Sequence, residues 1–215
     1  MIKAMVPMRS GSKGIPDKNI KEFLGKPLFR WNLDVLAKCQ MTGIIDEVYV
    51  NTDSEEYADF VQDYYSHVEI FMRSERTARD GAVNIDVAQE FVEKMDMADD
   101  DILLYVQVTS PYLRVEDVKN CLAALETGEF NSAMTVGIDK SGFIPGYDMV
   151  KARDTRRQDY VRLKTNGCIY ACTTAGGIRR TASLWEEPIY YHVQPYGFEL
   201  DEPADWVYGE EVMCE

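Results

Sequence analysis

The sequence predicts an α/β fold in which helices cover both faces of a mainly parallel sheet. Apolar runs of strand length alternate with amphipathic helical patterns along the first 138 residues, which is typical of such sheets. A length of 215 residues, with 46% hydrophobic and 28% charged residues, fits one ordinary globular domain spanning residues 1–215. No apolar run reaches the roughly 18 residues of a membrane span. We therefore expect one domain without a membrane partner.

Seven apolar runs have the length and composition of buried strands. They cover residues 2–7, 47–51, 68–72, 102–108, 132–138, 168–172 and 189–194.

Four amphipathic patterns predict helices between these strands. The first begins with Pro27 as its first helical residue, and the second is capped by Ser54. The third covers residues 85–95, and the fourth covers residues 115–125 and ends before Gly128. Strands and helices in this order build a Rossmann-like sheet, which binds ligands beyond the carboxyl ends of its strands.

Residues 139–165 interrupt the regular alternation. They show little periodicity and contain the helix and strand breakers Gly142, Pro145 and Gly146. Six Lys or Arg residues stand against two Asp between Lys151 and Lys164. Strand-like patterns resume afterwards, so we expect a flap or dimerisation insertion within the single domain rather than a linker.

The net charge of −14 is distributed unevenly. Residues 1–30 carry seven Lys or Arg residues against two acids, although the whole chain has 37 acidic and 23 basic residues. The acidic balance argues against nucleic acid and acidic membranes as partners, whereas the two basic islands favour a small anion. The N-terminus has no signal-peptide pattern, and the five cysteines are scattered without a C-x-x-C pair. We therefore expect a cytoplasmic protein with free thiols.

The loop after the first strand has the composition of a phosphate-binding loop. Pro7–Asn19 combines small residues, whose backbone can approach a ligand closely, with the cations of Arg9, Lys13 and Lys18. Consecutive backbone N–H groups in such a loop form a concavity for anions. The segment fits neither the G-x-x-x-x-G-K-[ST] pattern nor the G-x-G-x-x-G pattern. The loop therefore predicts a bound chain of phosphates, held by another type of cradle.

The segment R-S-G-S-K-G-I-P-x-K-N-I, at Arg9–Ile20, resembles the N-terminal signature of the acylneuraminate cytidylyltransferases, the CMP–sialic acid synthetases. Further segments resemble this family in the same order: Asn51–Ser54, Arg73 with Asp80–Asn84, Gln107–Arg114, Arg157–Gln158, Asn166–Tyr170 and Glu199–Asp201. The resemblance covers essentially the whole chain. It implies a fold of the nucleotide-diphospho-sugar transferase type. It also implies transfer of CMP from CTP to the anomeric hydroxyl of a 2-keto sugar acid, with release of pyrophosphate.

The resemblance assigns the first loop to the triphosphate and ribose of CTP. The residues expected to hold them are Arg9, Ser12, Lys18 and Asn19, to which charge alone adds Lys13. Arg9 and Lys18 are expected to act in catalysis, because an enzyme of this reaction mainly positions the reactants and neutralises phosphate charge.

The resemblance implies that Arg73 and Asn84 contact the cytosine and that Gln107 contacts the sugar. It gives Glu199 and Asp201 to a divalent cation, Mg²⁺ or Mn²⁺, with Asp201 in a catalytic role. In an extended segment both carboxylates point to one side, and Mg²⁺ is usually held by one or two carboxylates plus phosphates. The alternative is an acidic pair at the start of a helix, where negative charge is favourable.

The family resemblance also implies a homodimer. In that arrangement Arg157 could reach the carboxylate of the sugar bound to the neighbouring subunit. The alternative residues for this contact are Arg162 and Lys164.

Four positions differ from the family pattern. Asn84 stands where the family has serine, Glu199 where it has aspartate, Val108 where it has proline, and Tyr112 is inserted. Two alternative functions therefore stay open: a nucleotidyltransferase for another sugar or a sugar-1-phosphate, and a non-catalytic nucleotide-binding paralogue. Asp53, which follows the second strand, is interpreted as a loop or helix-cap residue.

Overall fold

The computed structural model describes residues 1–139 and 162–214. Within them, eight strands form one sheet in the order β10-β7-β9-β6-β1-β4-β5, with β8 paired to β7 beside this series. The strands are β1 Ile2–Pro7, β4 Glu47–Thr52, β5 Glu69–Met72, β6 Ile102–Val106, β7 Ser132–Asp139, β8 Arg162–Thr165, β9 Ile169–Thr174 and β10 Ile189–Gln194. The seven predicted apolar runs correspond to all of these except β8.

Strand direction divides the sheet into two parts. β5, β4, β1 and β6 run parallel, as the alternation with helices predicts. β9 runs antiparallel to both β6 and β7, whereas β10 is parallel to β7. β8 and β9 lie in succession along β7, separated by a kink at Gly167, whose φ is +69°. The mainly parallel sheet is therefore confirmed, and β8 and β9 are its two strands that run against the others.

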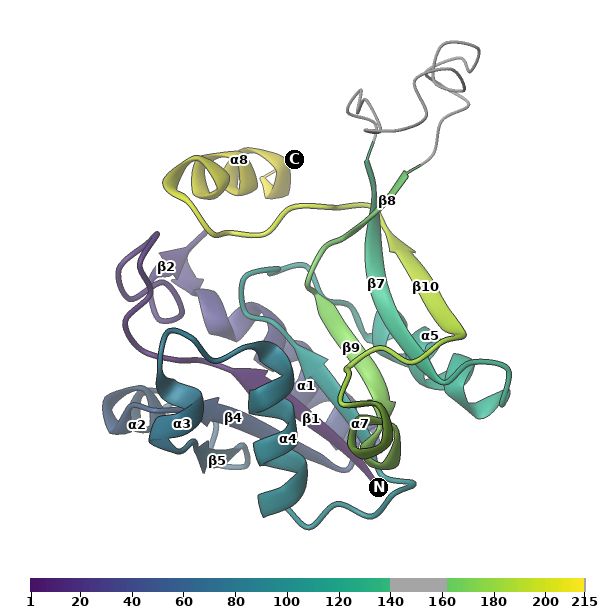
Figure 1. Cartoon of the computed structure of the whole chain (residues 1–215). Helices are drawn as coiled ribbons and strands as arrows, with labels where there is room; N and C mark the ends of the chain where they lie inside the picture. The colour runs from purple at the N-terminus through teal and green to yellow at the C-terminus, as the bar shows by residue number, and fades with distance from the viewer. Residues whose placement is uncertain (140–161, 215) are drawn as a thin grey trace, which may run out of the picture.

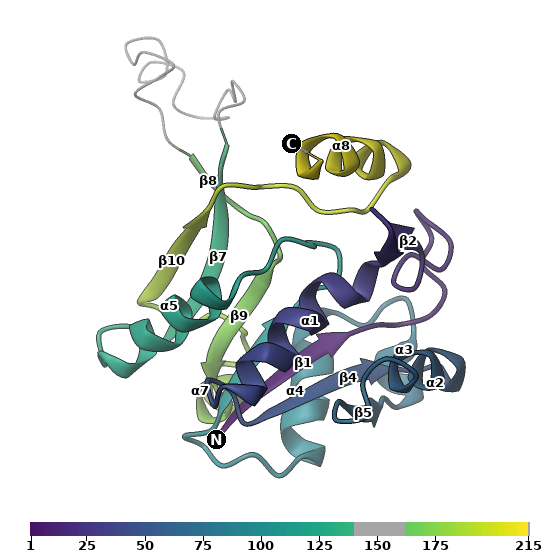
Figure 2. The ribbon, with the colours of Figure 1, turned by 180° about the vertical axis from the view of Figure 1, so that it is seen from behind.

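Helices lie on both faces of the sheet, as the sequence predicts. The described helices are α1 Leu28–Met41, α2 Glu55–Gln62, α3 Glu75–Ala78, α4 Asn84–Lys94, α5 Val115–Glu126, α7 Ala175–Thr181 and α8 Pro203–Met213. Figure 1 shows α4 and α7 in front of the sheet. Figure 2 shows α1 and α5 on the opposite face.

Each face of the sheet buries its own apolar core. Leu104 of β6 packs in the core that includes Leu36 of α1 and Val118 of α5. The adjacent residue Leu103 packs in the other core, which includes Phe91 of α4. Successive strand residues point to opposite faces. A strand covered on both sides therefore reads as a continuous apolar run rather than an alternating one.

α8 lies beside the sheet rather than on either face (Figure 1). Its Trp206 packs edge-on against Phe23, with the ring centroids 5.2 Å apart. Phe23 belongs to a small hairpin of β2 (Glu22–Phe23) and β3 (Lys26–Pro27) that follows the first loop. This contact brings the segment that precedes α8 next to the first loop.

The predicted helix boundaries are confirmed with one correction. The Ser54 hydroxyl accepts a hydrogen bond from the Tyr57 N–H at 3.2 Å, and Gly128 follows α5 with a φ of +71°. Pro27, however, lies outside α1. Its ψ of 137° is extended and it pairs with Glu22 in the hairpin, so the helix begins at Leu28.

Two further expectations concern membranes and the predicted insertion. No helix in the described ranges is long and apolar enough to cross a membrane. Most of the predicted insertion at 139–165 lies outside the described residues, so its role as a flap or dimerisation element stays a prediction.

Candidate active site

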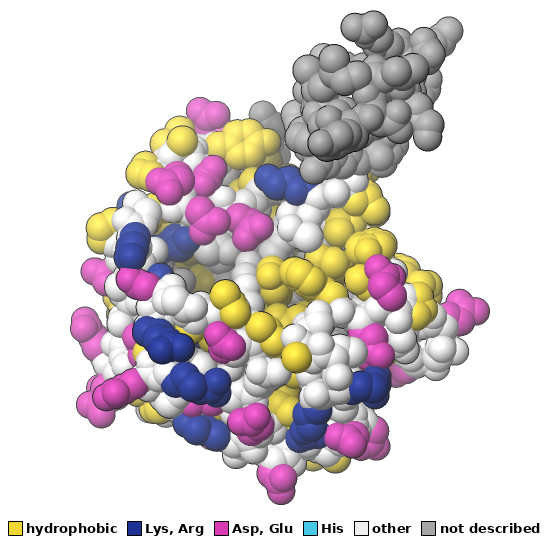
Figure 3. Space-filling view, viewed as in Figure 1, with side chains coloured by type: hydrophobic (Ala, Val, Ile, Leu, Met, Phe, Trp, Pro, Cys, Tyr) yellow, Lys and Arg dark blue, Asp and Glu magenta, His cyan; other side chains and the backbone are white. Residues whose placement is uncertain are grey.

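A cavity of about 460 Å³ opens beyond the carboxyl ends of β1 and β6. Figure 3 shows the molecule from this side, with basic side chains on one border of a hollow and acidic side chains above it. The lining residues are Pro7, Arg9, Ser12, Lys13, Gly14, Lys18, Asn19, Arg73, Thr77, Arg79, Ala82, Asn84, Val87, Tyr105, Gln107, Val108, Thr109, Glu199, Asp201 and Glu202. Its position agrees with the expectation for a parallel sheet.

Hydrogen bonds within the first loop and to neighbouring segments fix its conformation. Asp53, in the loop after β4, accepts hydrogen bonds from the backbone N–H of Ser10 at 2.7 Å and from its hydroxyl at 3.1 Å. The Asn19 amide donates to the Arg9 carbonyl oxygen at 3.0 Å and joins the two ends of the loop. Asp17 has a φ of 49° and accepts from the Tyr57 hydroxyl at 3.1 Å. Asp53 is thus a loop residue, as interpreted from the sequence, and it also fixes the cradle.

Three cations project from this loop, and each has an acidic partner. Arg9 and Lys13 both contact the carboxylate of Asp80, at 2.8 and 2.7 Å. Lys13, and to a lesser extent Arg9, lowers the pKa of Asp80 to about 2. Lys18 is buried and contacts Asp201 at 2.7 Å. The loop is therefore a surface of positive charge balanced by two carboxylates from distant parts of the chain.

Arg73 lies in the floor of the cavity. It is buried, and this burial lowers the pKa of its guanidinium group. Its Nη2 donates to the Asn51 carbonyl oxygen at 2.7 Å, which fixes the side chain. Its Nε is buried and has no hydrogen-bond partner within the described residues. A buried donor without a partner is costly.

The segment that follows Arg73 is fixed by a buried carboxylate. Glu90 of α4 accepts hydrogen bonds from the Thr77 hydroxyl and from the Ser74 N–H, and contacts Lys94 at 2.7 Å. Burial alone would raise the pKa of Glu90, but the hydrogen bonds from Lys94, Thr77 and Ser74 lower it to about 2. The charged Glu90 therefore holds the wall beside Arg73.

Asn84 is the first residue of α4 and lines the same cavity as Arg73. The Tyr105 hydroxyl donates to its Oδ1 at 3.0 Å. The amide nitrogen of Asn84 is consequently the end that faces a ligand as a donor. Tyr105 is buried, and burial raises the pKa of its hydroxyl, so it stays a neutral donor.

The acidic wall consists of the segment Glu199–Asp201. Leu200 is fully buried and its N–H donates to the Thr109 carbonyl oxygen at 2.8 Å, which turns both neighbouring carboxylates towards the cavity. Burial, and then the charge of Asp201, raise the pKa of Glu199. Gly14 of the first loop packs on the carbonyl oxygen of Asp201 so closely that a Cβ would clash. Basic loop and acidic segment are thus in direct contact.

Gly167 packs closely against both Gln107 and Glu199 of the acidic wall. A Cβ at this position would lie 2.5 Å from Oε1 of Gln107 and 2.7 Å from Oε2 of Glu199, and φ is +69°, so glycine is required twice over. Oε1 of Gln107 is buried and accepts no hydrogen bond from the described residues. Buried Asn166, held by Thr135 and Gln194 at 2.7 Å each, fixes the kink.

The predicted site residues gather in this one cavity wherever the structure describes them. They are Arg9, Ser12, Lys13, Lys18, Asn19, Arg73, Asn84, Gln107, Glu199 and Asp201. Arg157 lies outside the described residues. The structure thus brings the predicted set together, and the role of each member stays a prediction.

Sequence reasoning missed several lining residues. Tyr105 lies near the carboxyl end of β6 but in the middle of the predicted strand 102–108, so the predicted bounds did not indicate it. Thr77 belongs to the short helix α3, and Arg79 and Ala82 belong to the loop after it; no element was predicted there from the sequence.

Comparison with known proteins places the chain in a family. Residues 3–204 match the family model described as Cytidylyltransferase. The chain is 28% identical over 222 residues to the N-acylneuraminate cytidylyltransferase of Oncorhynchus mykiss, covering 98% of this chain and 50% of that protein. It is 29% identical over 231 residues to the CMP-N,N'-diacetyllegionaminic acid synthase of Legionella pneumophila, covering 99% and 96%. The chain therefore spans about half the length of the first relative and nearly all of the second.

Solved structures share the fold over the whole chain. A CMP:2-keto-3-deoxy-manno-octonic acid synthetase complexed with CTP gives a TM-score of 0.71 at 18% identity, covering 99% of this chain and 98% of that one. A 4-diphosphocytidyl-2C-methyl-D-erythritol synthase gives 0.67 at 14% identity, covering 99% and 97%. At these identities the similarity concerns the fold alone.

Proposed function

Because the chain belongs to the cytidylyltransferase family, we propose that it transfers CMP from CTP to the anomeric hydroxyl of a 2-keto sugar acid and releases pyrophosphate. One observation carries the proposal. A basic loop and an acidic pair line the same cavity, whose floor holds Arg73 and Asn84. This arrangement suits a charged nucleotide whose base enters the floor and whose phosphates lie between the two walls.

The floor suits cytosine. The ring O2 and N3 of cytosine accept hydrogen bonds, and the guanidinium group of Arg73 and the amide nitrogen of Asn84, two residues that line the cavity, are donors. Uracil carries a proton on N3, which would meet a donor instead of an acceptor. A site that leaves a polar group unpaired with the wrong base discriminates strongly against it.

The first loop suits the triphosphate. Arg9, Lys13 and Lys18 supply positive charge, and Ser12 and the loop backbone supply donors. The sugar hydroxyl attacks the α-phosphorus in line with the departing pyrophosphate, so the chain acts mainly by orienting both reactants and neutralising charge. Lys18 is the cation placed for the phosphorus nearest the acidic wall, because it already contacts Asp201.

We also propose a divalent cation, Mg²⁺ or Mn²⁺, held by Glu199 and Asp201. The donors fit: two carboxylates lie close enough for the charge of Asp201 to raise the pKa of Glu199. No group of three or more His, Cys, Asp and Glu in the described ranges could hold an ion by itself. Phosphate oxygens would therefore complete the oxygen shell that Mg²⁺ prefers. Such an ion, when bound, neutralises charge on the phosphates.

The acceptor is proposed to be a sugar acid of the nonulosonate type. The matching curated relatives are named for N-acylneuraminate and N,N'-diacetyllegionaminic acid. Gln107, which lines the cavity beside the acidic wall, is proposed to contact the sugar. Arg157 is proposed to contact the sugar carboxylate in a homodimer. Free thiols at the four buried cysteines and at Cys214 suit a cytoplasmic location.

The test is release of pyrophosphate with each of the four common nucleoside triphosphates, combined with a panel of 2-keto sugar acids and sugar-1-phosphates. We expect turnover with CTP and a nonulosonate, and dependence on added Mg²⁺ or Mn²⁺. Turnover only with a sugar-1-phosphate would contradict the proposed acceptor. Nucleotide binding without turnover on any acceptor would instead support the non-catalytic alternative.

A further inference from the structure

A single carboxylate joins two cations of the first loop. Oδ1 of Asp80 lies 2.8 Å from Nη1 of Arg9, and Oδ2 lies 2.7 Å from Nζ of Lys13. The two oxygens of one carboxylate thus join two cations that are separated along the loop. This is the geometry in which a phosphate group would bridge them.

Asp80 belongs to a segment that leads directly to Asn84, a proposed contact of the base. Residues 79–83 connect α3 with α4, so that Thr77 precedes them and Asn84 follows them. Arg79 and Ala82 of this segment line the cavity as well. All three partners of the bridge remain open to solvent, with 57% of the Asp80 side chain, 37% of Arg9 and 74% of Lys13 exposed. The contact can therefore open without unpacking a core.

The other acidic partner in the site is as exposed as Asp80, with 61% of the Asp201 side chain open to solvent, but it differs in its partner and in its backbone packing. Asp201 contacts Lys18, whose side chain is only 10% exposed, and its own backbone is packed on Gly14. Asp201 is thus built into the wall, whereas Asp80 reaches the loop from a separate surface segment. Asp80 is also the carboxylate that contacts two loop cations at once, so its departure would free both for another anion.

We propose that Asp80 is an internal competitor of the nucleotide, and that it determines selectivity for polyphosphates. Its carboxylate holds the anion position between Arg9 and Lys13 in the ligand-free protein, and the triphosphate displaces it. The inference rests on the proposed function in that it takes the bound anion to be the phosphate chain of CTP.

Two consequences follow from the competition. A ligand with a single negative charge gains little by replacing a carboxylate of equal charge, whereas a triphosphate brings several charges to the same two cations. Pyrophosphate, the anion left after transfer, meets the same competitor, so Asp80 returns to Arg9 and Lys13 as the product leaves. Removing the charge of Asp80 should therefore strengthen binding of every polyphosphate and slow pyrophosphate release.

The experiment is a calorimetric titration of the wild-type chain and the Asp80→Asn variant with CTP, pyrophosphate and cytidine at fixed ionic strength. Exposed ion pairs are individually weak, so loss of the two competing pairs should tighten CTP and pyrophosphate binding by about three- to tenfold. Cytidine, which has no phosphate, should bind both proteins equally. The Asp80→Glu variant keeps the charge and should retain wild-type affinities.

The matched control is Asp99→Asn. Asp99 is exposed and contacts Arg179 at 2.6 Å, away from the cavity, so the variant loses the same charge without freeing the loop. It should bind all three ligands as the wild type does. Equal tightening in this control would attribute the effect to net charge and overturn the proposal. Unchanged or weaker binding of CTP and pyrophosphate to Asp80→Asn would overturn it too. If the wild type binds pyrophosphate but not CTP, the proposed function fails while the pyrophosphate arm still tests Asp80.

Discussion

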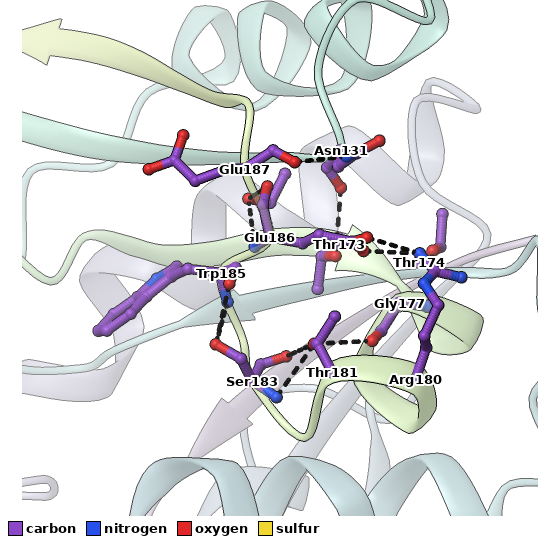
Figure 4. Close-up of polar contacts among 11 residues, drawn as sticks. Asn131, Thr173, Thr174, Gly177, Arg180, Thr181, Ser183, Trp185, Glu186 and Glu187 are labelled. Carbon is purple, nitrogen blue, oxygen red and sulfur yellow. Dashed lines mark hydrogen bonds and ion pairs between the residues drawn. The ribbon is translucent and has the colours of Figure 1, made fainter.

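Two polar regions of the molecule differ in how their hydrogen-bonding groups are satisfied. Around α7, side chains pair with one another and with the backbone (Figure 4). The Thr174 hydroxyl accepts from the Gly177 N–H at 3.0 Å, and Nη2 of Arg180 contacts both oxygens of Glu186 at 2.8 and 2.7 Å. In the cavity, Nε of Arg73 and Oε1 of Gln107 are buried without partners among the described residues.

The difference separates groups that stabilise the fold from groups in the residues that line the cavity. Leaving a buried donor or acceptor unpaired costs about 1–3 kcal/mol, so folding alone does not favour it. The hydrogen bonds of the α7 region stabilise a helix end and a loop. The cavity instead gathers charged side chains and two residues, Arg73 and Gln107, that each have an unpaired polar atom among the described residues. Substitutions in the first region should therefore change stability, and those in the second should change turnover.

The largest effect is expected for Asp201→Asn. Loss of this proposed metal ligand should remove several kcal/mol of transition-state stabilisation, so turnover should fall by about 100-fold or more. Initial rates at increasing Mg²⁺ and Mn²⁺ check this, since the variant should need more of either ion. The control Glu202→Gln likewise replaces a carboxylate by an amide, at the neighbouring residue, and should keep most activity. A variant with unchanged rate and metal dependence would leave the acidic pair a feature of the helix start.

Next in size are Arg9→Ala and Lys18→Ala. A charge-assisted hydrogen bond contributes about 1.5–3 kcal/mol, so each variant should lose one to two decades in kcat/KM for CTP. Lys18→Ala should lose more, because Lys18 is buried and also holds Asp201, whereas Arg9 is exchanged between Asp80 and the nucleotide. Steady-state kinetics with folded variants measure both. Near-normal kinetics in the two variants would mean that the first loop is not the phosphate cradle.

The sequence was most informative where a site residue follows directly from a strand. The loop after β1 and Gln107 after β6 lie where the ends of apolar runs indicate. It was less informative about contacts between distant segments. The packing of Gly14 on Asp201 and the contact of Asp80 with Arg9 depend on the path of the chain around the cavity, which no local pattern encodes. Pro27 was misplaced because its pairing partner, Glu22, belongs to a hairpin too short to show periodicity.

A smaller effect is expected for base recognition. Asn84→Ala removes one donor to the base, and a net hydrogen bond of about 1 kcal/mol corresponds to a roughly fivefold loss of preference for CTP over UTP. Tyr105→Phe sharpens the test, because it releases Oδ1 of Asn84 and lets the amide turn an acceptor towards N3 of uracil. The ratio of kcat/KM for the two nucleotides measures the preference. An unchanged ratio in both variants would place the base elsewhere.

The smallest effect on turnover is expected for Thr174→Ala, in the satisfied region. The Thr174 hydroxyl caps α7 through the Gly177 N–H, and loss of such a cap costs about 1 kcal/mol. Thermal unfolding should show this loss, whereas kcat and KM for CTP should stay at wild-type values because no group in the cavity moves. The matched variant Thr174→Ser keeps the hydroxyl and should restore stability. If Thr174→Ala lowered turnover without lowering stability, α7 would be coupled to the site and the contrast between the two regions would fail.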